Sequence, residues 1–548
     1  MTNYAKYVNP RGKRILETEQ VEAIPGREED MKQNNAGGFS FVVNDWDRLD
    51  RFLILGSEGG TYYVSERKLT VENAKTVNKL IAEDGVRVVN RVVEISDAGR
   101  APKNDAALFV LAMCTASKSV DVRRAAIAAL PKVARIGTHL FHFAEFVQGF
   151  RGWGRALRNG VANWYNCKDN DQLLNQLVKY QSRDGWSHRD LLRLSHPQTN
   201  DEVRNFLYKY AVGSADLSDA AEMPDTDNNT MQRLLASDQL LHETDPHEAV
   251  KLITEFGLPR EVVNTTLLND VGVWEALLEH MPITAMMRNL AKMTAIGLLK
   301  ANNSHVAKVV DTLQNVEILK KGRIHPLNVL VAMTTYGNGH GDKGSLTWEP
   351  VRDITDALED AFYASFDVVT PTNKRWLLGI DVSGSMTGAC ISGMSNITAN
   401  IAAAAMAMVT ARTEKRKQIM GFAHEFRDLG VSAKDSLEAV IKKTNDMSFG
   451  GTDCALPMTY ALQKKIEVDA FVVYTDSETW AGHSHPVQAL QQYRQKMGIP
   501  AKLIVVGMTA TEVSIADPND AGMMDVVGFD TATPDIMADF VRDEEKKA

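Results

Sequence analysis

Oxygen-bearing side chains gather in one tight loop of the last third of the chain. Asp381, Ser383 and Ser385 form the pattern Asp-x-Ser-x-Ser directly after the apolar run 376–380. Alternate residues of a tight loop can point the same way, and Gly384 eases the turn. The three side chains can therefore converge on one point.

Two further loops supply candidate partners for this set. Thr452 lies in a Gly-Gly-Thr-Asp run before an expected helix, and Asp476 follows the apolar run 471–475. In a doubly wound sheet, ligands bind at the carboxyl ends of the strands. Two carboxylates and three hydroxyls are hard oxygen ligands, which favour Mg²⁺ over zinc or copper, with Mn²⁺ or Ca²⁺ as alternatives.

The pattern favours a binding site over a catalytic one. A lone Asp-x-Ser-x-Ser can equally be a helix cap, but three loops that each adjoin strand-like or helical segments argue for a cation. No His, Lys or Cys is evidently paired with the set as a base or nucleophile, so hydrolysis is the weaker interpretation. His424, His483 and His485 are expected to be surface residues. An ion with few charged ligands would keep positions open for water or an external carboxylate.

The elements that must position this site form an α/β domain. Short apolar runs, typical of buried parallel strands, alternate with helical stretches, and this pattern begins near residue 370. The runs are 375–381, 417–424, 469–476, 501–508 and 524–530, and the helical stretches are 396–415, 436–444, 454–465 and 486–497. This alternation predicts a doubly wound parallel sheet covered on both sides.

The preceding part of the chain is helical. Short amphipathic segments recur from Trp46 to Phe366, with apolar residues at helical spacing and polar or Gly/Pro turns between them. Helices this short must stack to bury their faces, which predicts an α-solenoid of the HEAT type, although no strict repeat period is present. The predicted divisions are a polar segment 1–40, a helical-repeat domain 41–370 and an α/β domain 371–548.

Charge and composition limit the range of possible functions. The 548 residues carry a net charge of -9, yet the segment 121–200 holds 12 basic against 6 acidic residues, a local charge of +6. Such a segment on an acidic chain is typical of a polyanion site, and it also arises by chance. No apolar run is long enough for a membrane span, no secretory signal is evident, and four scattered cysteines fit a reducing cytoplasm.

Basic and aromatic side chains alternate in this segment. Arg151, Arg155 and Arg158 would share one helix face if the intervening glycines are helical, and Lys179 and Arg183 are also four residues apart. A capping box of Ser187 and Asp190 predicts a new helix with Arg189, Arg193 and His196 in one stripe. Trp153, Trp164, Tyr165 and Trp186 are candidate stacking faces, or core residues. These features suit RNA phosphates as well as an ordinary solvated surface.

Long segments of the chain closely resemble the Ro ribonucleoprotein family, which includes the sixty-kilodalton Ro autoantigen and bacterial relatives. The resemblance covers residues 41–540 and includes RFLILGSEGGTYY, THLFHF, WGRALR, NWYN, RDGWSHRDLLRLSH, MPITAMMRNLAKMT, IHPLNVLVAMTTYGNGHG, DVSGSM and GGTDCALPM. Two departures are a stretch from Phe146 to Trp153 shorter than in vertebrate relatives, and Gly384 in place of Ala.

The resemblance implies a ring of helical repeats, the TROVE domain, closed by a von Willebrand factor A domain with a metal-ion-dependent adhesion site. It implies Y-like noncoding RNA on a basic outer surface, single-stranded 3′ ends of misfolded or precursor RNA in the central hole, and RNA quality control with an exoribonuclease such as polynucleotide phosphorylase. The protein is then expected to be a monomeric, cytoplasmic, non-enzymatic scaffold. The positions that match the family's Y RNA determinants are Lys179, Arg183 and His196, with Arg155, Arg158, His188, Arg189 and Arg193 as neighbours. A cation-dependent protein-interaction module is the alternative, and a metal-dependent nuclease is the third.

Overall fold

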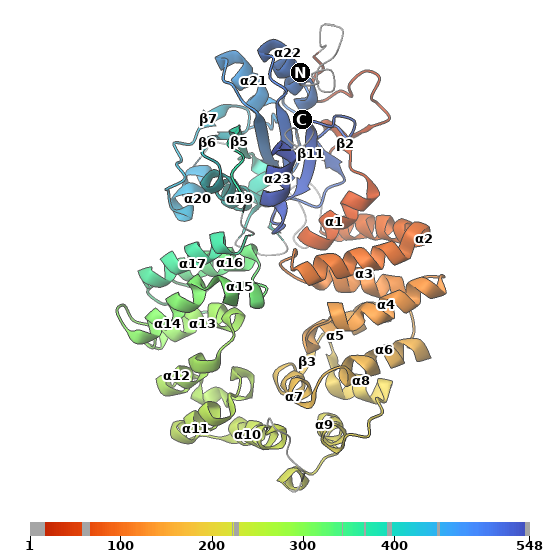
Figure 1. The fold of residues 1–548 in the computed structure, drawn as a ribbon, viewed down its shortest axis with the longest axis vertical. Coiled ribbons are helices and arrows are strands. Elements are labelled where there is room, and N and C mark those ends of the chain that lie inside the picture. The colour runs from red at the N-terminus through yellow and green to blue at the C-terminus, as the bar shows by residue number, and fades with distance from the viewer. Residues whose placement is uncertain are drawn as a thin grey trace.

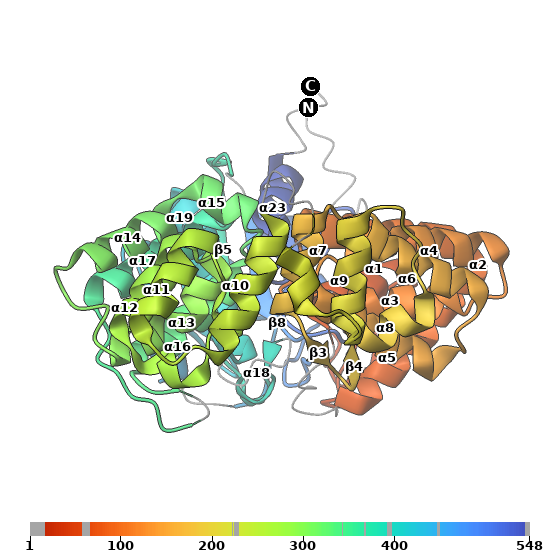
Figure 2. The ribbon, with the colours of Figure 1, turned by 90° about the horizontal axis from the view of Figure 1, so that it is seen from below.

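Two arms of helices extend from an α/β domain (Figure 1). The computed structural model describes residues 17–56, 66–221, 223, 229–341, 344–366, 369–391, 397–446 and 450–542. Figure 2, from below, shows one arm on each side, with parts of the α/β domain visible between them. None of the described helices is long and apolar enough to cross a membrane.

The first arm is a two-layered stack. Helices α2, α4, α6 and α8 pack in series, and α3 packs on α5 in a second layer. The arm comprises α1 (Asp45–Leu55), α2 (Glu66–Ala98), α3 (Asp105–Thr115), α4 (Val120–Val133), α5 (Gly137–Phe150), α6 (Arg155–Asn166), α7 (Asn170–Lys179), α8 (His188–Ser195) and α9 (Glu202–Val212), with the hairpin β3 (Ser182–Arg183) and β4 (Trp186–Ser187). This layering confirms the predicted HEAT-like solenoid.

The second arm continues the stack to the α/β domain. It comprises η2 (Leu217–Ala221), α10 (Thr230–His242), α11 (Pro246–Phe256), η3 (Arg260–Val262), η4 (Thr265–Asn269), α12 (Val271–His280), α13 (Ile283–Ala295), α14 (Ser304–Gln314), α15 (Val316–Lys321), α16 (Pro326–Gly337) and α17 (Arg352–Ala364). Helix α10 packs on α7 of the first arm, and α17 packs on α14 and α16. The arms therefore meet at the end far from the α/β domain.

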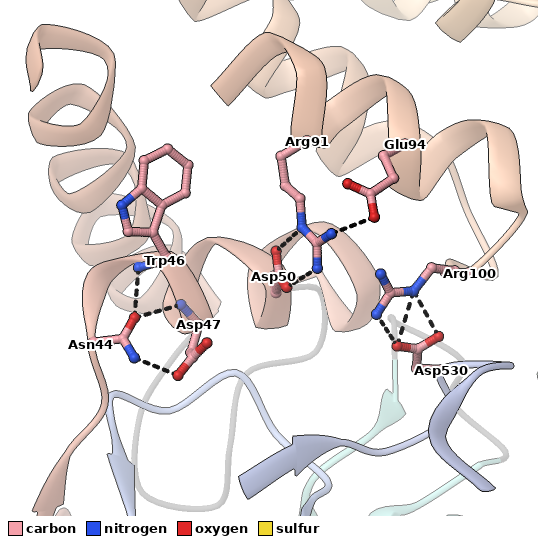
Figure 3. Close-up of polar contacts among 8 residues, drawn as sticks. All are labelled: Asn44, Trp46, Asp47, Asp50, Arg91, Glu94, Arg100 and Asp530. Carbon is pink, nitrogen blue, oxygen red and sulfur yellow. Dashed lines mark hydrogen bonds and ion pairs between the residues drawn. The ribbon is translucent and has the colours of Figure 1, made fainter. Parts of the chain in front are cut away.

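The arms also meet beside the α/β domain, where the ring closes. Arg323 forms an ion pair of 3.0 Å with Asp97, and the His325 ring bonds the Arg100 carbonyl at 3.1 Å. Arg100 in turn donates from Nε to both oxygens of Asp530, at 2.9 and 3.1 Å (Figure 3). One junction therefore ties both ends of the helical stack to the α/β domain.

The α/β domain has the predicted parallel sheet. The strand order is β11 (Met523–Val527), β9 (Lys502–Gly507), β8 (Ala470–Thr475), β5 (Arg375–Asp381), β6 (Arg416–Phe422) and β7 (Phe426–Asp428). All neighbouring pairs are parallel except β6 and β7. The five predicted strands are confirmed, whereas the short antiparallel edge strand β7 carried no apolar run.

Helices cover both faces of this sheet, as predicted. They are α18 (Gly384–Gly388), α19 (Ala399–Thr413), α20 (Leu437–Asn445), α21 (Leu456–Lys464), α22 (Pro486–Met497) and α23 (Thr533–Arg542). Side chains alternate along β5: Leu377 joins the core under α21 and α22, and Leu378 joins the core that continues into the helical arms. Burial on two sides explains why the strands are apolar throughout.

Residues 17–43 pack on the α/β domain, although they precede the helical arms. Strand β1 (Met31–Gln33) pairs with β2 (Phe39–Val42), and β2 pairs with β10 (Val513–Ser514). Arg27 binds both oxygens of Asp517 at 2.7 Å. The polar segment 1–40 was predicted only as a separate N-terminal unit, and its first sixteen residues lie outside the described part of the chain.

The junction predicts that removing the Asp530 carboxylate strongly lowers the stability of the fold. The Asp530 side chain is 3% exposed and that of Arg100 is 15% exposed, so Asp530→Ala would leave a largely buried guanidinium without its carboxylate and should destabilise the fold by about 3 kcal/mol. The matched control is Asp97→Ala, because this side chain is 68% exposed and its pair with Arg323 should contribute at most about 0.5 kcal/mol. Chemical denaturation of both variants measures the difference, and equal losses would contradict the role of the junction.

Candidate metal centre and basic surface

Three of the five predicted ligands lie in contact at the carboxyl end of β5. Asp381 is the last residue of that strand and is fully buried. Its Oδ1 accepts a hydrogen bond of 2.9 Å from the Ser383 amide, and its Oδ2 accepts one of 2.7 Å from the Thr475 hydroxyl. The Ser383 and Ser385 hydroxyl oxygens are 3.1 Å apart. The tight turn thus gathers these side chains, as the alternating pattern predicted.

Asp476 reaches the same point from the neighbouring strand. It follows β8, which pairs with β5, and its Oδ1 accepts a hydrogen bond of 3.1 Å from the Glu478 amide. Its Oδ2 is buried without a hydrogen-bond partner among the described residues. Burial and the neighbouring Asp476 carboxylate raise the pKa of Asp381 to about 7, and burial also raises the pKa of Asp476. Two buried carboxylates this close destabilise each other unless a cation separates them.

Thr452 belongs to a loop that is held against the segment after β8. Its carbonyl accepts hydrogen bonds of 3.0 Å from the amides of Trp480 and Ala481. A Cβ on Gly450 would lie 1.9 Å from the His424 ring, and a Cβ on Gly451 would lie 2.6 Å from that of Ala481. A side chain at either glycine would collide with these residues as they now lie, so the glycines allow this close approach of the loop, in which Thr452 is buried.

The donor set fits a divalent cation of the magnesium class. The residues supply hard oxygen ligands. The buried Asp476 Oδ2 has no hydrogen-bond donor, so its negative charge is not compensated by the described residues. In the described part of the chain no group of three or more His, Cys, Asp and Glu side chains could hold a metal. A site here must therefore use hydroxyls as well as carboxylates. The ligand set and the identity of the ion stay predictions.

The sequence reasoning missed Glu478, which lies beside this site. Glu478 is buried, and its oxygens accept hydrogen bonds from Asn35 Nδ2 at 2.6 Å and from the Ala36 amide at 3.1 Å. Burial and the Asp476 carboxylate raise its pKa to about 7. The polar run 475–479 after an apolar strand was a usable signal, but the partners in the N-terminal segment were not predictable.

His485 also departs from expectation. It was expected at the surface, yet it is 2% exposed, and its Nε2 bonds the Glu22 carbonyl at 2.8 Å. His485 therefore helps to fasten the N-terminal segment. His483 is exposed, as expected.

Most of the predicted basic residues are exposed and lie on or next to α6, α8 and the β3–β4 hairpin. These residues are Arg155, Arg158, Arg183, Arg189, Arg193 and His196, and Lys179 is half-buried at the end of α7. Within the described residues, Arg183 pairs with Asp184 at 3.6 Å, and the other five Arg and Lys side chains of this set have no carboxylate within 4.0 Å. We call these residues the basic surface. Its positive charge is almost uncompensated, so it attracts polyanions.

Two helical stripes that the spacing allowed are not formed. Residues 151–154 are not helical, and α6 begins only at Arg155, so Arg151 does not share a helix face with Arg155 and Arg158. Helix α7 ends at Lys179, which places Arg183 on β3 instead. The glycines at 152 and 154 favour this break. The capping box of Ser187 and Asp190 is confirmed.

His188 does not belong to the basic surface. It is 3% exposed, and its ring bonds the Tyr165 hydroxyl at 2.9 Å and the Gln176 carbonyl at 3.1 Å. Burial lowers its pKa to about 4, so the ring is neutral near pH 7. This burial does not fit direct contact with RNA, so His188 is left out of the basic surface.

The four candidate stacking residues divide into two pairs. Trp164 and Tyr165 are fully buried in the core of the first arm. Trp153 and Trp186 are half-buried and line a groove beside the basic surface. Only the second pair can therefore reach a ligand.

Comparisons with known proteins agree with both parts of the fold. Residues 32–256 and 255–335 match the TROVE domain, and residues 375–541 match the Ro60 vWA domain. The chain is 44% identical to the RNA-binding protein RO60 of Deinococcus radiodurans, over 99% of this chain and all of that protein. It is 37% identical to the RNA-binding protein RO60 of Caenorhabditis elegans, over 95% of this chain and 92% of that protein. The crystal structure of the Deinococcus radiodurans RO (RSR) protein matches with a TM-score of 0.68, covering 91% of this chain and all of that structure.

The paired carboxylates predict a metal-dependent stability. Mg²⁺ should raise the melting temperature above that in EDTA, because an ion bound only to the folded chain stabilises it by about 2.7 kcal/mol at one hundred times its dissociation constant. Asp381→Asn should abolish this gain, and in EDTA it should be no less stable than the unchanged chain, since one of two repelling charges is removed. Asp453→Asn is the control, because Asp453 lies outside the predicted ligand set and binds Gln20. A magnesium response that survives Asp381→Asn would contradict the site.

Proposed function

This chain belongs to the RO60 family of RNA-binding proteins, and we propose that it is a non-enzymatic scaffold that holds Y-like small noncoding RNA on its basic surface. The proposal places single-stranded 3′ ends of misfolded or precursor RNA at the centre of the helical ring. It assigns the protein to RNA quality control or processing with an exoribonuclease. Both named relatives are RNA-binding proteins, which supports the general assignment.

The observation that carries the proposal is the lack of counter-charges on the basic surface. Arg155, Arg158 and Arg189 are exposed and have no carboxylate within 4.0 Å among the described residues. A chain with a net charge of -9 has many acidic residues that could have neutralised them. Uncompensated guanidinium groups on exposed helix faces suit the phosphates of an RNA helix.

A second function is supported by the metal site. The buried Asp476 oxygen without a partner supports a bound cation, and an ion with neutral hydroxyl ligands would keep affinity for an external carboxylate. We therefore propose that an acidic side chain of a protein partner docks there. An exoribonuclease pulled down after RNase treatment, and lost with Asp381→Asn, would support this role. The nuclease alternative would require Mg²⁺-dependent RNA cleavage by the purified protein, and we expect none.

The proposed function predicts salt-sensitive binding that depends on Lys179 and Arg183. Affinity for a Y-like RNA should fall by at least about tenfold between about 50 and 300 mM salt, because phosphate contacts release counterions. Lys179→Ala with Arg183→Ala should weaken binding of this RNA more than binding of a single-stranded 3′ tail. Filter binding measures both affinities.

A matched control removes two positive charges elsewhere. Lys251 and Arg352 lie on α11 and α17, away from the basic surface, and each has an acidic neighbour within 4.0 Å. Replacing both with Ala should change neither affinity by more than about twofold. Affinity that is independent of salt, or equal losses for both RNAs in the Lys179 and Arg183 variant, would contradict the proposed function.

A further inference from the structure

Residues 17–43 bind the loop that follows the predicted metal ligand Asp476, and we call this segment the strap. Ser477, the first residue after Asp476, has a φ angle of 63°, a left-handed conformation that serine rarely adopts. Its carbonyl accepts a hydrogen bond of 3.2 Å from the Ser40 hydroxyl of the strap. A conformation of this kind persists only where its surroundings hold it. The strap therefore helps to fix the turn that directs the Asp476 side chain.

The strap also supplies hydrogen-bond donors to Glu478, the next residue of the loop. Asn35 Nδ2 and the Ala36 amide donate to the two carboxylate oxygens, at 2.6 and 3.1 Å. Glu478 is fully buried, and its own amide donates to Asp476 Oδ1 at 3.1 Å. A cation at Asp476 would offset the repulsion between these two buried carboxylates. It would thereby strengthen the bonds that join Glu478 to the strap.

Gln20 joins the strap to two of the loops that carry predicted ligands. Its side chain accepts a hydrogen bond from the Thr479 hydroxyl and donates one of 2.8 Å to Asp453, the residue after Thr452. The same Thr479 hydroxyl lies 3.2 Å from the Thr452 carbonyl. Gln20 and Thr479 are both fully buried. One buried side chain of the strap therefore fixes the Thr452 loop relative to the Asp476 loop.

The strap and the loop 477–484 are packed closely enough to move together. A Cβ on Gly38 would lie 2.0 Å from the Thr479 carbonyl oxygen, and a Cβ on Gly482 would lie 2.2 Å from Gln20 Nε2. The Thr479 carbonyl also accepts a hydrogen bond of 2.8 Å from Asn34 Nδ2. Because the two segments meet at these contacts, a shift of the loop would disturb the strap, and the reverse also holds.

We propose that the strap is a positioning element of the metal site, and that docking of the strap and binding of the cation strengthen each other. Asp476 and Thr452, which would hold the cation, belong to the loops that the strap binds. Coupling between two binding events is reciprocal, so each event changes the equilibrium of the other by the same factor. This inference rests on the proposed metal site, and it makes the docking of an acidic partner depend on the strap.

The first test measures the Mg²⁺ dissociation constant of the full chain by titration calorimetry. Asn34→Ala with Asn35→Ala removes the donors to Thr479 and Glu478 and should raise this constant by at least about fivefold, because hydrogen bonds to a buried carboxylate are strong. Asn35→Gln alone, which keeps an amide donor, should retain most of the affinity. The matched control is Gln33→Ala, because this exposed amide bonds the Gly37 carbonyl within the strap itself. It should change the constant by no more than about twofold.

Hydrogen exchange measures the coupling from the other side, and it needs no strap variant if the double alanine variant does not fold. Mg²⁺ should slow exchange in residues 34–40 by at least about fivefold relative to EDTA, and Asp381→Asn should abolish this effect. Peptides of α11, at the end of the ring far from the α/β domain, are the internal control (Figure 1). The factors from exchange and from calorimetry should agree within about threefold.

Two results would overturn the inference. One is Mg²⁺ that raises the melting temperature but leaves exchange in residues 34–40 unchanged. The other is an unchanged Mg²⁺ affinity in the folded Asn34 and Asn35 double variant. Failure of Mg²⁺ to alter the melting temperature of the unchanged chain would instead refute the metal site, and with it both the docking function and this coupling. The failure of the inference alone is therefore distinguishable from the failure of the proposed function.

Discussion

The ion pair between Arg100 and Asp530 is the interaction on which the ring depends. Arg100 lies after α2, at the start of the helical stack, and its carbonyl also holds His325 from the end of the stack. The packing of a helical solenoid does not by itself bring its two ends together, because each helix packs mainly on near neighbours. Closure therefore needs specific contacts between the two ends, which Arg323 and His325 make directly and which Asp530 of the α/β domain reinforces through Arg100. The loss of solvent around this carboxylate makes the pair sensitive to the removal of either partner.

A second contact between the first arm and the α/β domain leads to the predicted metal site. Arg51 of α1 is buried and donates to the Thr511 and Val513 carbonyls, at 2.7 and 3.1 Å, in the segment after β9. The Thr511 hydroxyl in turn approaches the Asp476 carbonyl at 3.4 Å. One chain of contacts thus runs from the first helix of the ring to a predicted metal ligand. A cation that orders Asp476 would stabilise the segment to which α1 is fastened.

Local sequence patterns were sufficient for the sheet and insufficient for its long-range contacts. Five apolar runs predicted the parallel strands, because burial on both faces leaves a continuous apolar signal. The pairing of β2 with β10 joins segments about 470 residues apart, and nothing in either segment marks its partner. His188 shows the same limit for the site: its residue type suits RNA, but its position at the start of α8 turns it into the core. Residue type therefore predicted candidates, and only packing decided between them.

The charge of an arginine does not tell whether it binds RNA or stabilises the fold. The side chains around it separate the two roles. Arg91, Arg375 and Arg412 each meet a carboxylate through a direct hydrogen bond, and so hold elements of the fold together. Arg155, Arg158 and Arg189 have no such neighbour among the described residues, although the chain is acidic as a whole. An uncompensated cluster adds self-repulsion to the folded state. Binding of a polyanion would offset that cost, so the absence of counter-charges supports RNA at this surface.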